Sequence, residues 1–272
     1  MKTIIVPTDF SPAALNAAYY AADMAKAIDA GILLLHVFYV LVSYTEVPPI
    51  IDESVMRENV ELKMDELKQQ LEHTYGDTLN ISAEIKMGGL LNQLESLCNE
   101  VQPYAVVMGS QGASATNYRF FGSQSVQAMK QLKWPVITVT RGAKFSDVKK
   151  IGLACDFENV IESTPVDEIK KLVGDFNAEL HILNSKKDEE PDPEKVFESG
   201  LMSEMLAPLP HEYHFITTQN TDEGIIDFIE KNTIDLLIVM PRRHNLLDKL
   251  IHRSHTKQLV LHSHVPVMSL HE

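Results

Sequence analysis

The hydrophobic positions of this chain fall into short unbroken runs, separated by longer segments with a helical period. The runs ILLLHVF at 32–38, YAVVM at 104–108 and PVITV at 135–139 do not alternate between apolar and polar positions. Strands buried on both faces, as in a parallel sheet, have this pattern. Ser11 before Pro12 favours a helix start, because serine caps the first turn and proline fits its first position. The alanine-rich segment that follows is predicted to be a helix.

Further apolar stripes with helical spacing lie between the other runs. They consist of Val60, Met64, Leu67 and Leu71; Leu90, Leu94 and Leu97; Val126, Met129 and Leu132; Val196, Phe197, Leu201 and Met205; and Ile225, Ile226 and Ile229. Strands and helices therefore alternate along the chain, which is the order of a doubly wound α/β fold.

This order of segments occurs twice. KTIIVPTDF near the N-terminus corresponds to KKIGLACDF in the second half, so that Asp9 corresponds to Asp156. The run at 104–108 corresponds to LLIVM at 236–240. The repeat is far longer than a solenoid period, which indicates a duplicated domain. We predict domains at 1–141 and 149–272, joined by a polar linker at 142–148.

Each half is predicted to be an α/β domain with a five-stranded parallel sheet and helices on both faces. The strand order 3-2-1-4-5 follows from this doubly wound fold class, not from individual residues. Ligands of such sheets bind beyond the carboxyl ends of the strands, where the strand order reverses. Asp9 follows the first strand and Gly109 ends the fourth, so both are expected at this point.

Charge and composition narrow the range of partners. The formal net charge is −14, and nucleic acid is not expected as a partner because it needs clustered Lys and Arg. No apolar run reaches about 18 residues, so no membrane span is expected. The start MKTIIVPTDF lacks the apolar centre of a signal peptide. Cys98 and Cys155 form no pair motif, and we expect a cytoplasmic location.

The segment VMGSQGASATNYRFFGS is rich in glycine. Gly109 ends a strand, Gly112 follows it closely, and Gly122 with Ser123 begins a helix. Glycines let backbone N–H groups converge on an anion, and a helix start favours a phosphate. The spacing matches neither GxxxxGK[ST] nor GxGxxG. From spacing alone, an ordinary turn, an ordinary helix start and an Asp9 helix cap remain the alternative.

The pattern G-x2-G-x9-G-S after Val107 and Met108, together with Pro7-x-Asp9, resembles the nucleotide loop of the universal stress protein family. The resemblance covers essentially the whole chain as two tandem copies, and it is more specific in the first copy. It implies the 3-2-1-4-5 fold and a stress-response regulatory module. For the copy with the glycine loop it implies binding of ATP, AMP or another adenine nucleotide, with or without Mg²⁺.

Carried over by position, the resemblance implies a cofactor-binding set in the first copy. Asp9, in the Pro7-x-Asp9 pattern, would face the ribose and adenine. The main chain of Val37 and Phe38 would border the adenine, and Met108 would pack beside the ribose or base. The phosphates would be held by Gly109, Gly112, Gly122, Ser123 and Gln124.

The second copy departs from the family pattern. Pro241, His244 and Arg253 stand where the three glycines are expected, and only Asp156 and Ser254 keep their residue types. We therefore expect about one nucleotide per chain, in the first copy. The second copy would be a degenerate structural partner that pairs internally with the first through the last strand. A homodimer is also compatible with the resemblance.

Neither catalytic residues nor metal ligands are assigned from the sequence. No nucleophile and base stand at an arguable spacing, so slow ATP hydrolysis is retained only as an alternative, beside a nucleotide-free partner-binding protein. Histidines gather near the C-terminus, and His252 and His255 are spaced to share a helical face. Imidazole suits Zn²⁺, but no cysteine or clear carboxylate completes a ligand set there.

Overall fold

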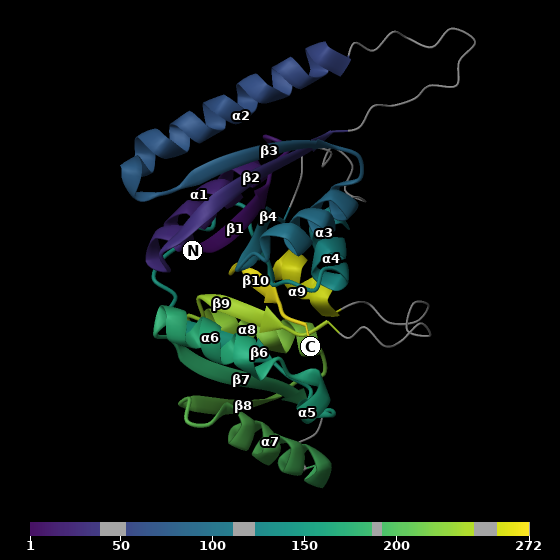
Figure 1. Cartoon of the computed structure of the whole chain (residues 1–272). Helices are drawn as coiled ribbons and strands as arrows, with labels where there is room; N and C mark the ends of the chain where they lie inside the picture. Colours follow the sequence, from purple (N-terminus) through teal and green to yellow (C-terminus); the bar gives the residue numbers. More distant parts are fainter. Residues whose placement is uncertain (39–52, 111–122, 187–191, 242–254, 272) are drawn as a thin grey trace, which may run out of the picture.

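A computed structural model describes residues 1–38, 53–110, 123–186, 192–241 and 255–271 (Figure 1). The first half contains β1 (Lys2–Pro7), α1 (Pro12–Ala27), β2 (Ala30–Phe38), α2 (Glu53–Tyr75), β3 (Ile81–Met87), α3 (Leu90–Val101), β4 (Ala105–Gly109), α4 (Ser123–Gln131) and β5 (Val136–Val139). The second half contains β6 (Lys150–Ala154), α5 (Val160–Ser163), α6 (Val166–Phe176), β7 (Glu179–Lys186), α7 (Pro193–Leu206), β8 (His211–Thr217), α8 (Thr221–Asn232), β9 (Leu236–Val239), α9 (His255–His262) and β10 (Val267–Ser269).

The strands that the structure describes form one sheet of ten, in the order β3-β2-β1-β4-β5-β10-β9-β6-β7-β8. The first five have the order 3-2-1-4-5 within their half, and the second five repeat it. Neighbouring strands are parallel except β5 and β10, which are antiparallel. The predicted fold class and strand order are therefore confirmed.

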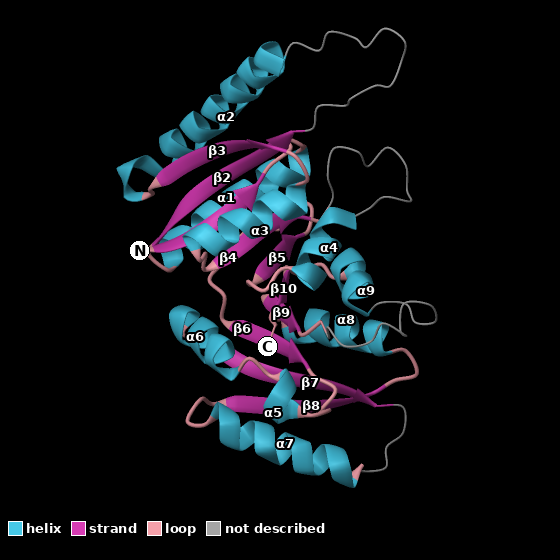
Figure 2. Cartoon of the chain, turned by 45° about the vertical axis from the view of Figure 1, so that its right-hand side comes forward, coloured by secondary structure: helices cyan, strands magenta, loops and turns pink. Residues whose placement is uncertain are grey.

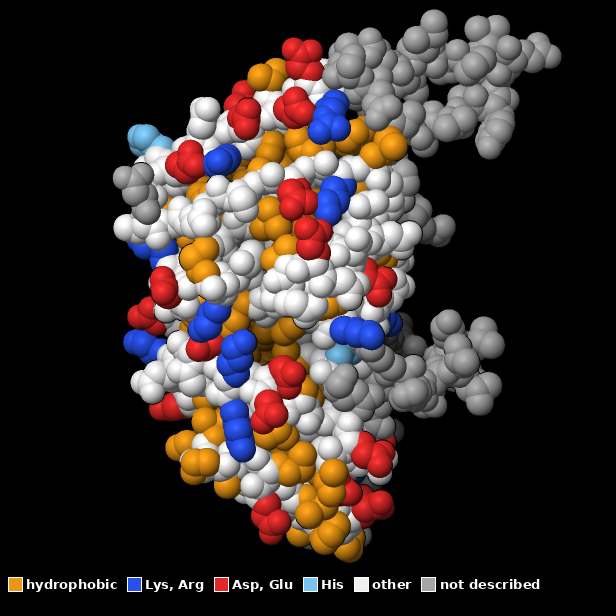
Figure 3. Space-filling model, in the orientation of Figure 1, with side chains coloured by type: hydrophobic (Ala, Val, Ile, Leu, Met, Phe, Trp, Pro, Cys, Tyr) orange, Lys and Arg blue, Asp and Glu red, His pale blue; other side chains and the backbone are white. Residues whose placement is uncertain are grey.

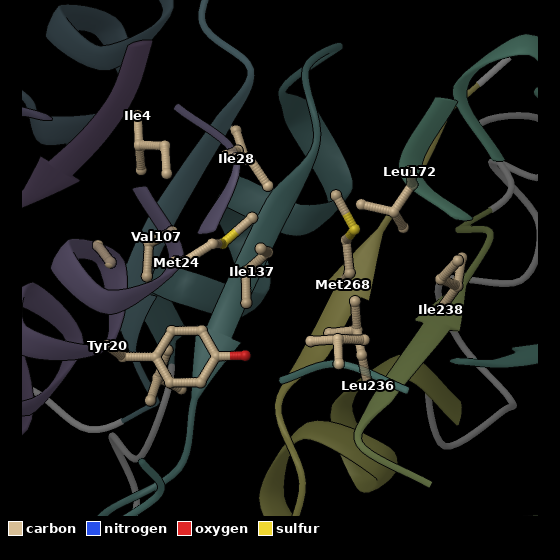
Figure 4. Packing of buried hydrophobic residues seen from close by; sticks show 14 of the residues in the cluster. Ile4, Tyr20, Met24, Ile28, Val107, Ile137, Leu172, Leu236, Ile238 and Met268 are labelled. Atoms are coloured by element: carbon tan, nitrogen blue, oxygen red, sulfur yellow. The ribbon is translucent and has the colours of Figure 1, made fainter. Parts of the chain in front are cut away.

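Helices cover both faces of this sheet (Figure 2). On one face α1, α2, α6 and α7 enclose a core, and on the other face α3, α4, α8 and α9 enclose a second one. Both cores contain residues of both halves. Figure 4 shows Ile137 of β5 and Met268 of β10 facing each other where the halves meet, within the first core. The duplicated domains thus share continuous hydrophobic cores.

The junction of the halves is symmetric in register. Val136 pairs with Ser269, and Thr138 pairs with Val267. Val136 and Val267 each follow the proline of a Pro-Val pair, so equivalent positions of the two repeats contact each other in reverse order. The Thr138 hydroxyl also donates to the Val267 carbonyl at 3.2 Å. The two halves therefore pair internally through their last strands.

Side chains outside the sheet also connect the halves. Lys2 Nζ lies 2.7 Å from Asp175 Oδ1, which joins β1 to α6. Phe145, in the segment expected to be a polar linker, lies between Tyr20 and Phe176, at ring-centroid distances of 5.4 and 6.0 Å. This connecting segment therefore packs against α1 and α6.

The apolar stripe predicted for α7 is confirmed at Leu201 and Met205, which are partly buried against the first core, and is wrong at Val196 and Phe197. Val196 and Phe197 are 57% and 65% exposed, whereas Met202 and Leu206 are buried. The helix presents a neighbouring stripe to the sheet, because side chains three and four positions apart share a face. The predicted stripe of α2 is largely confirmed, since Met64, Leu67 and Leu71 are all buried.

The surface is mixed in charge on the face shown in Figure 3, where Lys and Arg side chains are interspersed with Asp and Glu. No continuous basic patch is visible there, as the net charge of −14 would suggest. Among the helices that the structure describes, none combines the length and hydrophobicity that crossing a membrane requires.

Candidate functional site

The carboxyl ends of three neighbouring strands bring much of the expected site to one edge of the first-half sheet. β1 runs parallel to β2 on one side and to β4 on the other. β2 and β3 lie on one side of β1, and β4 and β5 lie on the other side, so the strand order reverses beside β1. This is where open α/β sheets bind ligands. The expected residues at this edge are Pro7, Asp9, Val37, Phe38, Met108 and Gly109.

The rest of the expected set belongs to the segment between β4 and α4. α4 begins at Ser123, and the side chain of Gln124 in its first turn is exposed. Gly112 and Gly122 lie outside the described residues, as do His244, Arg253 and Ser254 of the second half.

Asp9 is an exposed residue that shapes the turn between β1 and α1. Its Oδ1 accepts a hydrogen bond from the Ser11 amide at 3.0 Å. Ser11, not Asp9, caps α1, because the Ser11 hydroxyl accepts from the Ala14 amide at 3.2 Å. Phe10 between them has a φ of 60°, which is uncommon for a residue with a Cβ. The turn therefore directs a carboxylate outward from the end of β1.

His36 was not expected from the sequence, although it is the one polar residue within the run ILLLHVF. Its Nδ1 lies 2.8 Å from the Thr8 carbonyl oxygen. A carbonyl only accepts, so Nδ1 carries the proton. The ring stacks on Phe10 with centroids 4.8 Å apart. Burial lowers the pKa of His36, which the bond to Thr8 and the charge of Asp9 oppose, while Lys63 lowers it further.

The second half builds the same turn with other residues. Asp156 Oδ1 accepts from the Glu158 amide at 3.1 Å, and Phe157 has a φ of 56°. Asn184 replaces His36 and donates to the Cys155 carbonyl at 2.8 Å. The Asp-Phe turn is thus a feature of the fold, and its presence alone does not indicate a ligand.

Gly109 is required by the packing of the protein itself. A Cβ at this position would lie 2.7 Å from the carbonyl oxygen of Ala13 in α1. Such a distance to a backbone atom is too short, so any other residue would displace α1 or β4. The glycine therefore allows close approach of helix and strand, in addition to any role at a ligand.

Strand register corrects the expected alignment of the second half. Val106 pairs with Val136, and Leu237 pairs with Val267. The equivalent of Gly109 is therefore Met240, one residue earlier than the expected Pro241, which corresponds to Ser110. In this half the helix after the first strand is broken into α5 and α6, and α5 packs against α7. The single helix whose first turn requires Gly109 in the first half is therefore interrupted in the second half.

Comparisons with known proteins agree with this architecture. The model of the universal stress protein family matches twice, at residues 1–140 and 148–271. A universal stress protein from Archaeoglobus fulgidus DSM 4304 is similar in structure, with a TM-score of 0.72 and 20% identity, covering 99% of this chain and 96% of that chain. A functionally unknown protein from Pseudomonas aeruginosa PAO1 has a TM-score of 0.59 and 13% identity, covering 99% and 92%. The comparison with curated proteins gave no match. Since the family model covers nearly the whole chain in two copies, the chain belongs to the universal stress protein family.

Proposed function

We propose that the first half binds one adenine nucleotide, ATP or AMP, and that the chain is a regulatory module of the stress response. In this proposal residues 1–141 form the nucleotide-binding domain, 142–148 connect the domains, and 149–272 form a degenerate structural partner. Both cysteines are buried and neither forms a disulfide, which agrees with the proposed cytoplasmic location. Binding, and not turnover, is the proposed activity.

The observation that carries this proposal is the convergence of different chemical groups at one edge of the sheet. The exposed Asp9 follows β1, the half-buried Val37 and buried Phe38 end β2, and Gly109 ends β4. An apolar border beside a carboxylate suits a nucleoside, which has a flat base and ribose hydroxyls that donate hydrogen bonds.

The phosphates would lie at the start of α4. The first amides of a helix have no partner within it, and the helix dipole favours an anion there. The exposed Gln124 stands in this first turn. Asp9 is proposed to contact the ribose, where its negative charge lies away from the phosphates.

The same edge of the second half has different chemistry. By register, Ser185 takes the place of Val37 and Lys186 that of Phe38. The Ser185 hydroxyl donates to Thr221 at 2.9 Å, so it is already engaged. Met240 takes the place of Gly109. A polar border and a bulky residue directly after β9 support a single nucleotide site in the first half.

The test is to identify what the intact chain retains and binds. The protein is purified without added nucleotide, denatured in acid, and the released small molecules are identified by mass spectrometry. Calorimetry of the stripped protein with ATP, AMP and GTP then measures affinity. We expect saturable binding of the adenine nucleotides and weaker binding of GTP. A stripped, folded protein that binds neither ATP nor AMP would refute the proposal.

A further inference from the structure

Two strands of the second half carry the same short pattern, a glutamate two positions before a histidine. Glu179 and His181 lie on β7, and Glu212 and His214 lie on β8. β7 and β8 are parallel, and His181 pairs with Glu212. Side chains alternate along a strand, so all four project from the same face of the sheet. This is the face covered by α8, where the Phe228 ring lies 4.6 Å from that of His214.

The nitrogen and oxygen atoms of three of these residues converge. His181 Nδ1 lies 3.0 Å from His214 Nε2, and Glu212 Oε2 lies 3.7 Å from each of these nitrogens. Ligand atoms of a tetrahedral Zn²⁺ with bonds of about 2.0–2.2 Å are roughly 3.3 Å apart. The two nitrogens need to separate, and the carboxylate to approach, by only a few tenths of an ångström.

The exposure of two of these side chains fits this adjustment. His181 is nearly buried, with a side-chain exposure of 8%, and provides a fixed position. The Glu212 side chain is 71% exposed and can rotate toward the two rings. β8 is the last strand of the sheet, so an ion from solution can approach from its open side.

The fourth residue supports the nitrogen on the far side of His181. His181 Nε2 is buried without a hydrogen bond, and Glu179 Oε2 is 3.7 Å away. A metal on Nδ1 fixes the proton on Nε2, where it faces this carboxylate. Histidine ligands of metals commonly donate their second N–H to a carboxylate, which orients the ring.

The fold does not require this set of residues. By register, the equivalent positions in the first half are Gly31, Leu33, Ser82 and Glu84. That half forms the same two strands without a histidine at any of them. The cluster is therefore particular to the second half. It does not include any of the histidines near the C-terminus that the sequence brings to attention.

We propose that His181 Nδ1, His214 Nε2 and the Glu212 carboxylate bind a divalent transition ion of the zinc class, with Glu179 orienting His181. Two imidazoles and one carboxylate leave the fourth tetrahedral position to water. This ligand set does not suit Mg²⁺ or Ca²⁺, because both ions prefer oxygen ligands and two of the three ligand atoms are nitrogens. The metal takes the place of the proton shared by the two rings, and the ring that carried this proton keeps it on its other nitrogen, so both imidazoles bind the metal in their neutral form.

The experiment uses the full chain, stripped of metal by a chelator and titrated with Zn²⁺ by calorimetry. The variants are Glu212→Gln and His214→Asn. The controls are Glu84→Gln, at the first-half equivalent of His214, and His262→Asn, an exposed histidine of α9. We expect one saturable Zn²⁺ site, an affinity at least about 100-fold lower in each variant, and no change in the controls. Glu179→Gln should lower the affinity about 10-fold.

A second readout locates the ion. Anomalous scattering at the zinc edge from a crystal soaked in Zn²⁺ should place it between β7 and β8. The absence of a saturable site, or an unchanged affinity in either Glu212→Gln or a folded His214→Asn, would overturn the proposal. If His214→Asn does not fold, Glu212→Gln decides, because its exposed side chain is not needed for packing. The Zn²⁺ titration and the anomalous scattering are both independent of whether the first half binds a nucleotide.

Discussion

His36 Nδ1 donates to the Thr8 carbonyl oxygen at 2.8 Å, and this bond ties the end of β2 to the turn that carries Asp9. Asn184 makes the same link to Cys155 in the second half. Two different side chains thus satisfy the same backbone carbonyl at equivalent positions. The bond is a requirement of the fold that either an imidazole or an amide can meet.

The first prediction concerns this bond. His36→Asn should change the free energy of unfolding by less than about 1 kcal/mol, because asparagine can donate as Asn184 does. His36→Leu leaves the carbonyl without its donor and should cost about 1–3 kcal/mol. Urea unfolding of the two variants measures the difference. Equal stabilities would show that the bond contributes nothing.

The second prediction concerns pH. The pKa of His36 in the folded chain is lowered from 6.5, chiefly by burial. The unfolded chain therefore takes up this proton more readily, and the contribution of His36 to stability is present above pH 6.5 and is lost as the pH falls below it. As the pH falls from 7 to 5, the free energy of unfolding of the wild type should decrease relative to that of His36→Asn. A difference independent of pH would contradict the lowered pKa.

The third prediction separates packing from ligand binding at Gly109. Gly109→Ala places a Cβ against the Ala13 carbonyl, so it should destabilise the ligand-free chain by about 1–3 kcal/mol. The matched control is Gly174→Ala, since a Cβ at that position in α6 meets nothing within 4 Å. It should stabilise the chain by up to about 1 kcal/mol. Thermal unfolding without nucleotide tests both; a Gly109→Ala variant as stable as wild type would disprove the close contact.

The fourth prediction compares the two Asp-Phe turns. Asp9→Ala and Asp156→Ala each remove a carboxylate that accepts from the amide two residues later, so their effects on stability should be similar. Only Asp9→Ala should weaken binding of adenosine and ATP, by about 10-fold or more for a hydrogen bond to a charged group. Calorimetry with both ligands tests this. If Asp9→Ala lowered the affinity for ATP but left that for adenosine unchanged, Asp9 would not contact the nucleoside.

The sequence was sufficient to predict the elements and their duplication because these signals are local, whereas the strand order followed from the fold class. The unbroken apolar runs, the Ser11-Pro12 helix start and the repeated Asp-Phe each depend on a few adjacent residues. The alignment of Gly109 with Pro241 failed, because Val-Met occurs in both halves while hydrogen bonds to β6 and β10 set the register one residue earlier.

Contacts between side chains of neighbouring strands could not be predicted from such local signals. The bond from His36 to Thr8 and the approach of His181 to His214 join residues 28 and 33 positions apart. Only strand register brings them together. For the histidine cluster a signal existed, the repeated Glu-x-His, but its meaning depends on β7 and β8 being neighbours. The close contact of Gly109 with Ala13 likewise depends on the three-dimensional packing of α1.

The most direct test of the proposed function is the number of ATP molecules that the intact chain binds. Calorimetry of nucleotide-free protein, at low and at moderate salt, gives both stoichiometry and salt dependence. We predict one site per chain that persists at moderate salt, because aligned backbone amides are less sensitive to screening than an exposed cation. The site should be retained in Asp156→Ala. No site, or two equal sites, would contradict a single nucleotide-binding half.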